Sequence, residues 1–474
     1  DKVDEDKLVE EAIIKMLAQL DPHSTYSDAE EVKKMNEPLQ GNFEGIGVQF
    51  QMIEDTLLVV QPVSNGPSEK IGILAGDRII AVNDSAIAGV KMSTEEIMKR
   101  LRGPKGSKVN LKIVRRGVQD PLVFTVKRDK IPILSLDASY MIQPKTGYIR
   151  INRFGATTAE EFKKAMKELQ KQGMKDMILD LQGNGGGYLN AAIDLANEFL
   201  GQKELIVYTE GRTAKRSDFY AKGNGEFRNG RLIVLVDEYT ASASEIVSGA
   251  VQDWDRGIIV GRRSFGKGLV QRPIDLPDGS MIRLTIARYY TPAGRCIQKP
   301  YDSSTDYNKD LIERFNHGEL MKVQTKKLGR TVYGGGGIMP DYFVPIDTTL
   351  YTDYHRNLVA KGAVIKFTMK FIEGHRKELA NKYKKFESFN EKFIIDDDML
   401  ATLREMGEKE GVKFNEEQYQ KSLPLIKTQL KALIARDLWD MNEYFRVMNT
   451  TNESVQKALE ILNSEEYQKK LRAN

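Results

Sequence analysis

The spacing of apolar residues along the chain begins with a helical pattern. Over residues 4–20, apolar side chains recur mostly at steps of three and four residues, which predicts an amphipathic helix. That helix is expected to end before Pro22, because proline disfavours helical geometry in the residue that precedes it. A second short helix is expected over residues 28–35. Residues 1–41 are therefore predicted to be a helical N-terminal segment.

Residues 42–127 change to the two-residue period that is typical of strands. Strands are predicted where Ile46, Val48 and Phe50 alternate and at residues 57–61, 78–82, 109–114 and 122–126. One or two short helices are expected among them, one of them at 94–101. Turn residues such as Asn65-Gly66-Pro67 separate them. The segment is long enough to fold as a domain by itself.

From residue 128 to residue 349 the predicted strands and helices alternate. Strands are expected at 147–151, 177–181, 232–236 and 257–260, with helices at 158–172, 190–200 and 242–254 between them. Such alternation predicts a largely parallel α/β sheet. A β-hairpin is expected over residues 269–290, turning at Pro277-Asp278-Gly279. Residues 350–474 are highly charged and are predicted to be a helical C-terminal extension.

The composition is that of an ordinary globular protein and excludes several classes. The 474 residues carry a net charge of +4 without a long basic block, which argues against a nucleic-acid partner. No apolar run reaches the roughly 18–20 residues of a membrane helix. Cys296 is the only cysteine, so an intrachain disulfide and a cysteine-based zinc site are excluded. The chain opens at Asp1 without a Met and without an apolar signal-type core, as a protein trimmed of an export segment or a cytosolic fragment would.

Three common kinds of active site fit the sequence poorly. The histidines are not spaced as zinc ligands, and all of them lie outside the predicted sheet (His23, His317, His355 and His375). The loop at residues 261–268 resembles a phosphate-binding loop, but Gly268 stands where a magnesium-binding Ser or Thr is needed. In the glycine run at 183–187, Tyr188 occupies the third glycine position of a dinucleotide motif. That run is either a tight turn or a loop whose N–H groups face an anion or oxyanion.

A serine and a lysine offer another chemistry. Ser242 lies between the predicted strand 232–236 and a helix, where N–H groups can stabilise negative charge. Lys267 stands between Gly266 and Gly268 and close to apolar residues, and burial can lower the pKa of a lysine until it acts as a neutral base. The alternative is that the serine only caps the helix and the lysine lies on the surface.

The chain resembles the carboxyl-terminal processing (tail-specific) serine proteases. The resemblance rests on five ordered blocks between residues 20 and 341: Leu20–Ser24 with Gly45-Ile46-Gly47, Gly147–Ile151, Asp180–Gly187, Thr240–Gln271, and Gly334–Gly337 with Pro340-Asp341. It implies a crotonase-like α/β protease core (residues 128–349) with an inserted PDZ domain (residues 42–127) and helical N- and C-terminal extensions.

The resemblance also implies roles for residues of the core. It makes Ser242 the nucleophile, Lys267 the general base, and Gln271 the residue that orients the lysine. The oxyanion donors correspond to the backbone N–H groups of Ala243 and Gly186. Ser244 corresponds to a serine that is not the nucleophile, and Asp253 to an acid that we expect to be structural. No metal and no cofactor are implied. Gln182 and Gly185 replace the Arg and Pro that are usual in the family, which questions an ion pair and the stiffness of the loop.

In the PDZ domain, the carboxylate-binding loop of the family corresponds to Gly45, Ile46, Gly47 and Val48, and Arg102 corresponds to an arginine that couples peptide binding to activity. The implied partners are protein or peptide substrates with accessible C-termini, which add to the domain as a strand. Homo-oligomer or adaptor contacts through the terminal helices are a further expectation. The resemblance implies a periplasmic or cell-envelope location in a bacterium. The competing function is a peptide-binding module with an inactive core, but the presence of Ser242, Lys267 and Gln271 favours the enzyme.

Overall fold

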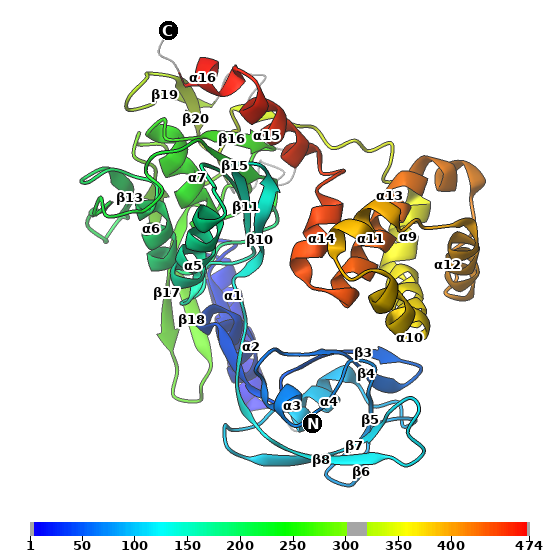
Figure 1. The fold of residues 1–474 in the computed structure, drawn as a ribbon. Coiled ribbons are helices and arrows are strands. Elements are labelled where there is room, and N and C mark those ends of the chain that lie inside the picture. Colours follow the sequence, from blue (N-terminus) through cyan, green and yellow to red (C-terminus); the bar gives the residue numbers. More distant parts are fainter. Residues whose placement is uncertain (1–3, 301–319, 472–474) are drawn as a thin grey trace. The chain divides into compact units, whose positions relative to one another are not determined.

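The computed structural model describes residues 4–300 and 320–471, so His317 lies outside the described residues. The chain divides into two compact units. The first contains residues 1–41, 134–346 and 452–474, and the second contains residues 42–133 and 347–451. Figure 1 shows the helices and strands of both. Each unit therefore combines segments that are far apart in the sequence.

A six-stranded sheet forms the centre of the first unit. Its order is β10 (Leu136–Gln143), β11 (Thr146–Ile151), β12 (Asp176–Asp180), β15 (Leu232–Val236), β16 (Ile258–Gly261) and β21 (Tyr342–Phe343). Strands β11 to β21 pair in parallel, and only β10 pairs antiparallel with its neighbour. The prediction of a largely parallel α/β sheet is confirmed. Strand β15 is buried at every residue, as expected of a central parallel strand.

Three helices alternate with these strands: α5 (Thr158–Lys171), α6 (Leu189–Asn197) and α7 (Ala243–Asp253). Phe162, Leu195 and Val247, one from each helix, lie in a single apolar core with residues of the sheet. The residue that caps α5 is Thr157, since the hydroxyl of Thr158 is turned to Ser135 at 2.7 Å. All three predicted helices are present within a few residues of their expected bounds.

A second, antiparallel sheet lies in the same unit. Its order is β1 (Thr25–Ser27), β18 (Met281–Tyr290), β13 (Leu205–Glu210) and β14 (Ser217–Tyr220), and β17 (Leu269–Asp275) also pairs with β18. The predicted hairpin at 269–290 is therefore confirmed as β17 and β18. The N-terminal helices are α1 (Glu5–Ala18) and α2 (Ala29–Gln40), and β19 (Met321–Gln324) pairs with β20 (Thr331–Gly334).

The last two helices of the described chain belong to the first unit. Helices α15 (Glu453–Asn463) and α16 (Glu466–Lys470) contact the protease-like sheet. The hydroxyl of Tyr467 accepts a hydrogen bond of 2.9 Å from the backbone N–H of Leu232, and the Arg231 guanidinium donates to the Leu462 carbonyl at 2.7 Å. The structure thus differs from the expectation of one extension over 350–474, because α15 and α16 belong to the first unit and contact its sheet.

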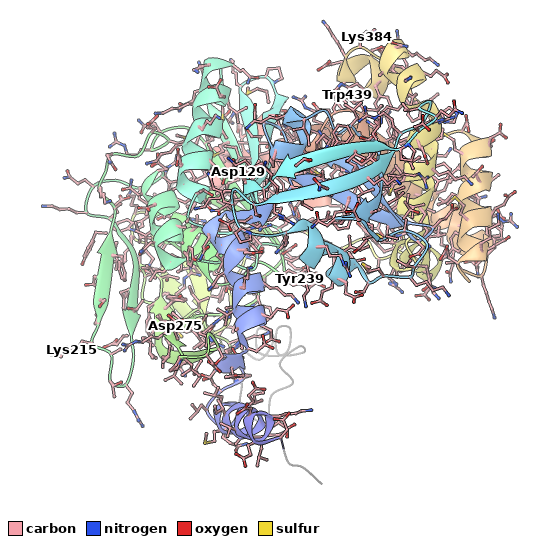
Figure 2. All side chains as sticks on the ribbon, turned by 90° about the horizontal axis from the view of Figure 1, so that it is seen from below. Asp129, Lys215, Tyr239, Asp275, Lys384 and Trp439 are labelled. Atoms are coloured by element: carbon pink, nitrogen blue, oxygen red, sulfur yellow. The ribbon has the colours of Figure 1, made fainter. Side chains whose placement is uncertain are left out.

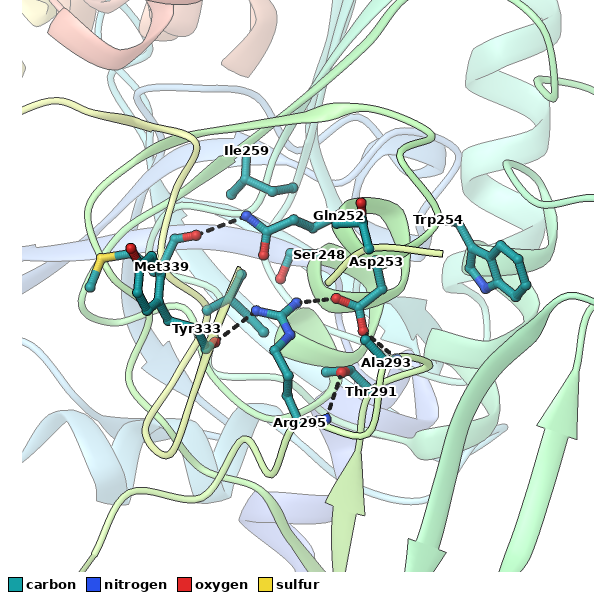
Figure 3. A network of polar contacts seen from close by, with 12 residues as sticks. Ser248, Gln252, Asp253, Trp254, Ile259, Thr291, Ala293, Arg295, Tyr333 and Met339 are labelled. Carbon is teal, nitrogen blue, oxygen red and sulfur yellow. Dashed lines mark hydrogen bonds and ion pairs between the residues drawn. The ribbon is translucent and has the colours of Figure 1, made fainter. Parts of the chain in front are cut away.

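A buried ion pair fixes the end of α7. Asp253 and Arg295 are almost completely buried, and their oxygen and nitrogen atoms lie 2.5 Å apart. The second Asp253 oxygen accepts from the Ala293 N–H at 2.7 Å, and Arg295 donates to the Tyr333 carbonyl at 2.9 Å (Figure 3). Asp253 is the last residue of the helix, one residue before the predicted end at 254. These contacts occupy both carboxylate oxygens and favour a structural role.

The second unit contains the predicted β-rich domain. Its main sheet has the order β3 (Val48–Ile53), β4 (Thr56–Pro62), β5 (Arg78–Val82), β7 (Lys108–Val114) and β8 (Leu122–Lys127), with β6 (Ser85–Ala86) paired to β5. Helices α3 (Pro67–Lys70) and α4 (Thr94–Leu101) accompany it. Strands β2 (Asn42–Gly45) and β9 (Asp129–Pro132) pair and bring the two ends of the domain together.

Helices make up the remainder of the second unit: α9 (Asp353–Ala360), α10 (Ala363–Lys382), α11 (Phe386–Lys392), α12 (Asp397–Lys409), α13 (Glu416–Leu438) and α14 (Met441–Met448). They share an apolar core that is rich in aromatic rings. Trp439, labelled in Figure 2, packs edge-on against Phe386 and Phe389 in this core. The helical character predicted for this part of the chain is confirmed.

Candidate active site

Ser242 stands at the turn between β15 and α7 in an unusual backbone conformation. Its φ is +55° and its ψ is −114°, although it is not a glycine. Such a residue costs roughly 1–3 kcal/mol and persists only where the surrounding structure enforces it, most often at functional sites. The same turn contains Tyr239, labelled in Figure 2, whose side chain is 67% exposed. The geometry presents the serine at the N-terminus of a helix.

Glu245 joins the serine turn to the loop that carries Lys267. One carboxylate oxygen accepts from the backbone N–H groups of Ser242 at 2.8 Å and Lys267 at 2.9 Å. The other accepts from the Ser264 hydroxyl at 2.5 Å and the Gly266 N–H at 2.7 Å. Glu245 is fully buried, and burial raises its pKa against these hydrogen bonds, which lower it. A single side chain therefore fixes both candidate catalytic residues.

The surroundings of Lys267 favour its neutral form. Burial lowers the pKa of the Lys267 ammonium group, and the nearby Arg283 guanidinium lowers it further. The carboxylates of Asp21 and Glu245 oppose this effect. The net direction is downward, as required of a lysine that accepts a proton near neutral pH.

Residues of the N-terminal segment lie beside this lysine. The Gln271 amide nitrogen donates to the His23 carbonyl, which ties β17 to the turn at residues 21–24. Asp21 stabilises that turn by accepting from the N–H groups of His23 at 2.8 Å and Ser24 at 2.9 Å. Burial lowers the pKa of His23, and the charge of Lys267 lowers it further. The sequence predicted that a helix ends before Pro22, but nothing in it placed His23 near the lysine.

The glycine loop lies against the serine. A Cβ atom on Gly186, whose φ is +99°, would come within 2.8 Å of the Ser242 Cβ. However, the Gly186 N–H already donates to the Asn184 side-chain oxygen at 2.8 Å. This differs from the expectation that Gly186 N–H is an oxyanion donor, because the group has an acceptor in the loop itself.

The next amide, that of Gly187, has a different orientation. Gly187 forms a parallel bridge with Phe154, in which the Gly186 carbonyl accepts from Phe154 and the Tyr188 N–H donates to Phe154. In such a bridge the N–H of the central residue faces the opposite side. The Gly187 N–H therefore faces away from Phe154. The sequence gave no means of distinguishing it from Gly186.

Other groups of the serine turn have structural contacts. Ala243 is the first residue of α7, where helix N–H groups carry partial positive charge. The Ser244 hydroxyl is buried and donates to the Asn184 carbonyl at 3.0 Å. Tyr289, from β18, hydrogen-bonds with Ser242, and burial raises the pKa of its phenol to about 12, so the phenol is neutral. The sequence did not indicate Tyr289.

The unusual Gln182 does not leave the loop without an ion pair. Arg150, from β11, lies 2.6 Å from the buried Asp180 carboxylate and donates to the Gln182 carbonyl at 2.7 Å. The Gln182 side chain instead accepts from the Asn452 side chain at 3.0 Å. The substitution of the usual arginine is thus accommodated by an arginine on the neighbouring strand.

In the second unit, the Gly45–Val48 turn precedes strand β3, which is an edge strand of its sheet. Gly47 has a φ of +74°, and the Ile46 carbonyl accepts from both the backbone and the hydroxyl of Ser68. The Arg102 guanidinium lies over the Phe43 ring, 4.8 Å from its centroid. An edge strand beside a glycine turn can accept a peptide as an additional strand.

Neither a metal cluster nor a membrane helix is found in the described part of the chain. No three His, Cys, Asp or Glu side chains there lie close enough together to hold a metal ion. None of its helices is both long and apolar enough to cross a membrane.

Comparison with known families identifies the class of protein. Residues 145–305 match peptidase family S41, and residues 45–130 match the PDZ domain. Residues 354–440 match a family of unknown function, DUF8443. The first unit thus contains a peptidase domain, and the second contains a PDZ domain.

Comparison with individual proteins identifies the family. The chain is 40% identical over 302 residues to a carboxy-terminal-processing protease of Bartonella bacilliformis, covering 62% of this chain and 68% of that protein. It is 38% identical over 299 residues to carboxy-terminal processing protease CtpA of Bacillus subtilis (63% of each chain). It is 35% identical over 412 residues to a probable CtpA-like serine protease of Staphylococcus epidermidis (81% and 82%). This chain belongs to the carboxy-terminal processing protease family.

A solved structure with similarity to the chain is the photosystem II D1 C-terminal processing protease. It is 28% identical, with 74% of this chain and 85% of that chain covered and a TM-score of 0.40.

Replacing Glu245 by Gln should uncouple the two candidate catalytic residues. Glutamine keeps one acceptor oxygen and points an NH₂ group at donors, each of which costs about 1–3 kcal/mol when left unsatisfied. We expect kcat to fall about 100-fold, because displacements near 1 Å at a reacting group have that effect. Cleavage kinetics on an unstructured protein substrate measure the fall in kcat, and a thermal melt measures the loss of stability.

Glu198→Gln is the matched control. Glu198 is also buried and accepts from the Glu226 N–H at 3.0 Å. It caps the C-terminal end of α6 and does not contact Ser242. It should lose stability and keep its kcat. Equal kcat values for Glu245→Gln and the wild type would contradict the coupling role.

Proposed function

We propose that this protein is a serine endopeptidase that binds substrate C-termini in its PDZ domain and cleaves peptide bonds with Ser242 and Lys267. One observation carries the proposal: the buried Glu245 carboxylate hydrogen-bonds the backbones of both residues. The lowered pKa of Lys267 supports its role as a base. The competing function, a peptide-binding module with an inactive core, gives no reason for this arrangement.

In the proposed reaction, neutral Lys267 removes the proton from the Ser242 hydroxyl, whose oxygen attacks the peptide carbonyl carbon. The Ala243 N–H, with a glycine-loop N–H, stabilises the resulting oxyanion. Because Gly186 donates to Asn184, we assign the second donor to Gly187. Lys267 then protonates the leaving amine and leaves an acyl-enzyme. Water attacks that ester and gives its proton to Lys267. The lysine returns this proton to the Ser242 oxygen as the ester bond breaks, which releases the second product and regenerates the hydroxyl and the neutral amine.

Gln271 is proposed to orient Lys267 through its amide oxygen. Its amide nitrogen is held by the His23 carbonyl, which fixes the plane of the side chain. The oxygen at the other corner of the amide is then the group that can accept from the lysine.

We also propose a bacterial periplasmic or cell-envelope location. The relatives from Bartonella bacilliformis and Bacillus subtilis are bacterial, and the resemblance implies export. Fractionation of cells that express the complete gene tests the location, and recovery in the cytosol alone would refute it.

Replacing Ser242 or Lys267 by Ala should abolish cleavage, whereas Ser244→Ala should retain clear activity. Ser242 and Lys267 act as one unit, so either loss should lower kcat by about 10⁴-fold or more. Ser244 contributes one buried hydrogen bond of about 1 kcal/mol, so its loss should appear mainly in the melting temperature. Gel-based cleavage of an unstructured protein with an apolar C-terminus measures all three variants. An active Ser242→Ala enzyme would refute the nucleophile.

Activity should rise with pH through the pKa of Lys267. Only the neutral amine can accept the serine proton, and burial and Arg283 lower the pKa at which it becomes neutral. Activity should therefore be lost as the pH falls through that pKa. Arg283→Gln removes the repelling charge, so the rising limb should move to higher pH. A profile of kcat/KM that is identical in both enzymes would contradict the assignment.

Amidating the substrate C-terminus should weaken cleavage at sub-saturating concentration. A terminal carboxylate can accept from N–H groups at Gly45–Val48, and such charge-assisted bonds contribute about 1.5–3 kcal/mol. The loss corresponds to about 10-fold to 100-fold in binding. A chain that lacks residues 42–133, with Gly41 joined directly to Leu134, should lose the discrimination. Equal rates for the acid and the amide in the full chain would show that the PDZ domain does not bind the carboxylate.

The terminal helices are proposed to mediate self-association, and α1 offers the supporting observation. Leu8 and Met16 lie on one stripe of this helix and are 60% and 64% exposed. Leu8→Asp with Met16→Asp should shift the chain to a smaller molar mass in light scattering. Glu5→Gln with Glu11→Gln, which leaves the apolar stripe intact, is the control. A wild-type chain that is monomeric at all concentrations would refute the proposal.

A further inference from the structure

Asn184 occupies a position that no catalytic role explains. It is completely buried in the glycine loop between β12 and α6. Its side-chain oxygen accepts from the Gly186 N–H at 2.8 Å, and its side-chain nitrogen donates to the Ile151 carbonyl at 2.9 Å. Its polar atoms are thus used entirely within the protein, and none is available to a substrate.

The backbone of Asn184 contacts the serine turn. Its carbonyl accepts from the Ala241 N–H at 2.9 Å and from the Ser244 hydroxyl at 3.0 Å. These two residues flank Ser242 on either side. The loop is therefore held at Asn184 to β11 through Ile151 and to the serine turn through this carbonyl.

The side-chain contact determines the orientation of the following peptides. A bond from an Asn oxygen to the N–H two residues on closes an Asx turn, which fixes the backbone between them. Gly185 and Gly186 have little conformational preference of their own, and a Cβ on Gly185 would meet no atom within 4 Å. Without the Asx turn, the Gly186 N–H would lose its acceptor in the loop. The family's usual proline would stiffen the loop at 185, and this chain has glycine there.

We propose that Asn184 is a positioning residue that directs the Gly187 N–H toward the oxyanion formed at Ser242. It withdraws the Gly186 N–H into the loop, and the bridge to Phe154 then turns the Gly187 N–H to the other side. The inference rests on the proposed protease function. Its effect belongs to the transition state, because the peptide carbonyl oxygen acquires its charge only there.

The test compares Asn184→Ala with Asn184→Ser. Alanine removes the Asx turn, whereas a serine hydroxyl can accept from the N–H two residues on, although more weakly. Asn184→Ala should lower kcat about 10-fold to 100-fold, with KM changed less than about twofold. Asn184→Ser should recover at least threefold of that loss. Affinity for a peptidyl boronic acid, whose tetrahedral adduct carries the oxyanion, should fall by the same factor as kcat.

Asn197→Ala is the matched control. Asn197 is also buried, donates to the Asn224 side chain at 2.8 Å and accepts from the Lys222 N–H at 2.7 Å, at the far end of α6. It should lower the melting temperature and leave kcat and boronate affinity unchanged. A loss of kcat in this variant equal to that in Asn184→Ala would overturn the inference, because it would reduce the effect to stability.

Two further outcomes would overturn it. One is a kcat of Asn184→Ala within twofold of the wild type, and the other is a reduced kcat with unchanged boronate affinity. If the alanine variant does not fold, Asn184→Ser decides: kcat and boronate affinity that fall by the same factor support the inference, and a reduced kcat with unchanged boronate affinity overturns it. Ser242→Ala is measured in parallel. Its activity would refute the proposed function, whereas an inactive Ser242→Ala beside a fully active Asn184→Ala would refute only the positioning role.

Discussion

The buried carboxylate of Glu245 is the constraint on which the site depends. A carboxylate without water is stable only when hydrogen bonds replace its hydration, and Glu245 obtains four of them. Those donors come from the serine turn and from the lysine loop, so satisfying the charge brings the two together. The same requirement holds Ser242 at its positive φ, because its N–H must point inward to the carboxylate. Burial of one charge thus determines the geometry of the reacting groups.

The pKa of Lys267 is set by the elements that surround the hydrogen bonds of Glu245. The lysine loop lies beside β18, which contributes Arg283, and beside the N-terminal turn, which contributes Asp21. Repulsion and burial together outweigh the attraction, so the amine loses its proton more readily than in water. The pKa of the candidate catalytic lysine therefore depends on Asp21 and Arg283, which lie far apart in the sequence, although its motif is local.

Local sequence patterns predicted the positions of helices and strands well. They did not predict which side chains form hydrogen bonds with each other in the folded protein. The bounds of β5, β15 and α4 agree with the predicted residues, because each is a short periodic segment bounded by turn residues. Motif and chemistry singled out Ser242 and Lys267 as candidates. The sequence did not indicate Glu245, Asn184 and Tyr289, because each contacts the candidate site across a long separation in the sequence. Gly186 and Gly187 are the same residue type in the sequence, and the hydrogen bond to Asn184 and the bridge to Phe154 distinguish them in the structure.

The C-terminal helices are a second case in which the sequence predicts an element but not its packing partner. The amphipathic pattern of the helices after residue 350 predicts that each packs against an apolar surface, but it does not identify that surface. Helices α15 and α16 pack on the peptidase sheet and not with the other C-terminal helices. Asn452, which caps α15, also donates to Gln182 at the start of the glycine loop. An arginine at 182 could not accept that bond, since a guanidinium has no acceptor. Because Arg150 pairs with Asp180, position 182 needs no charge for that pair, and the neutral Gln182 can bind the cap of α15.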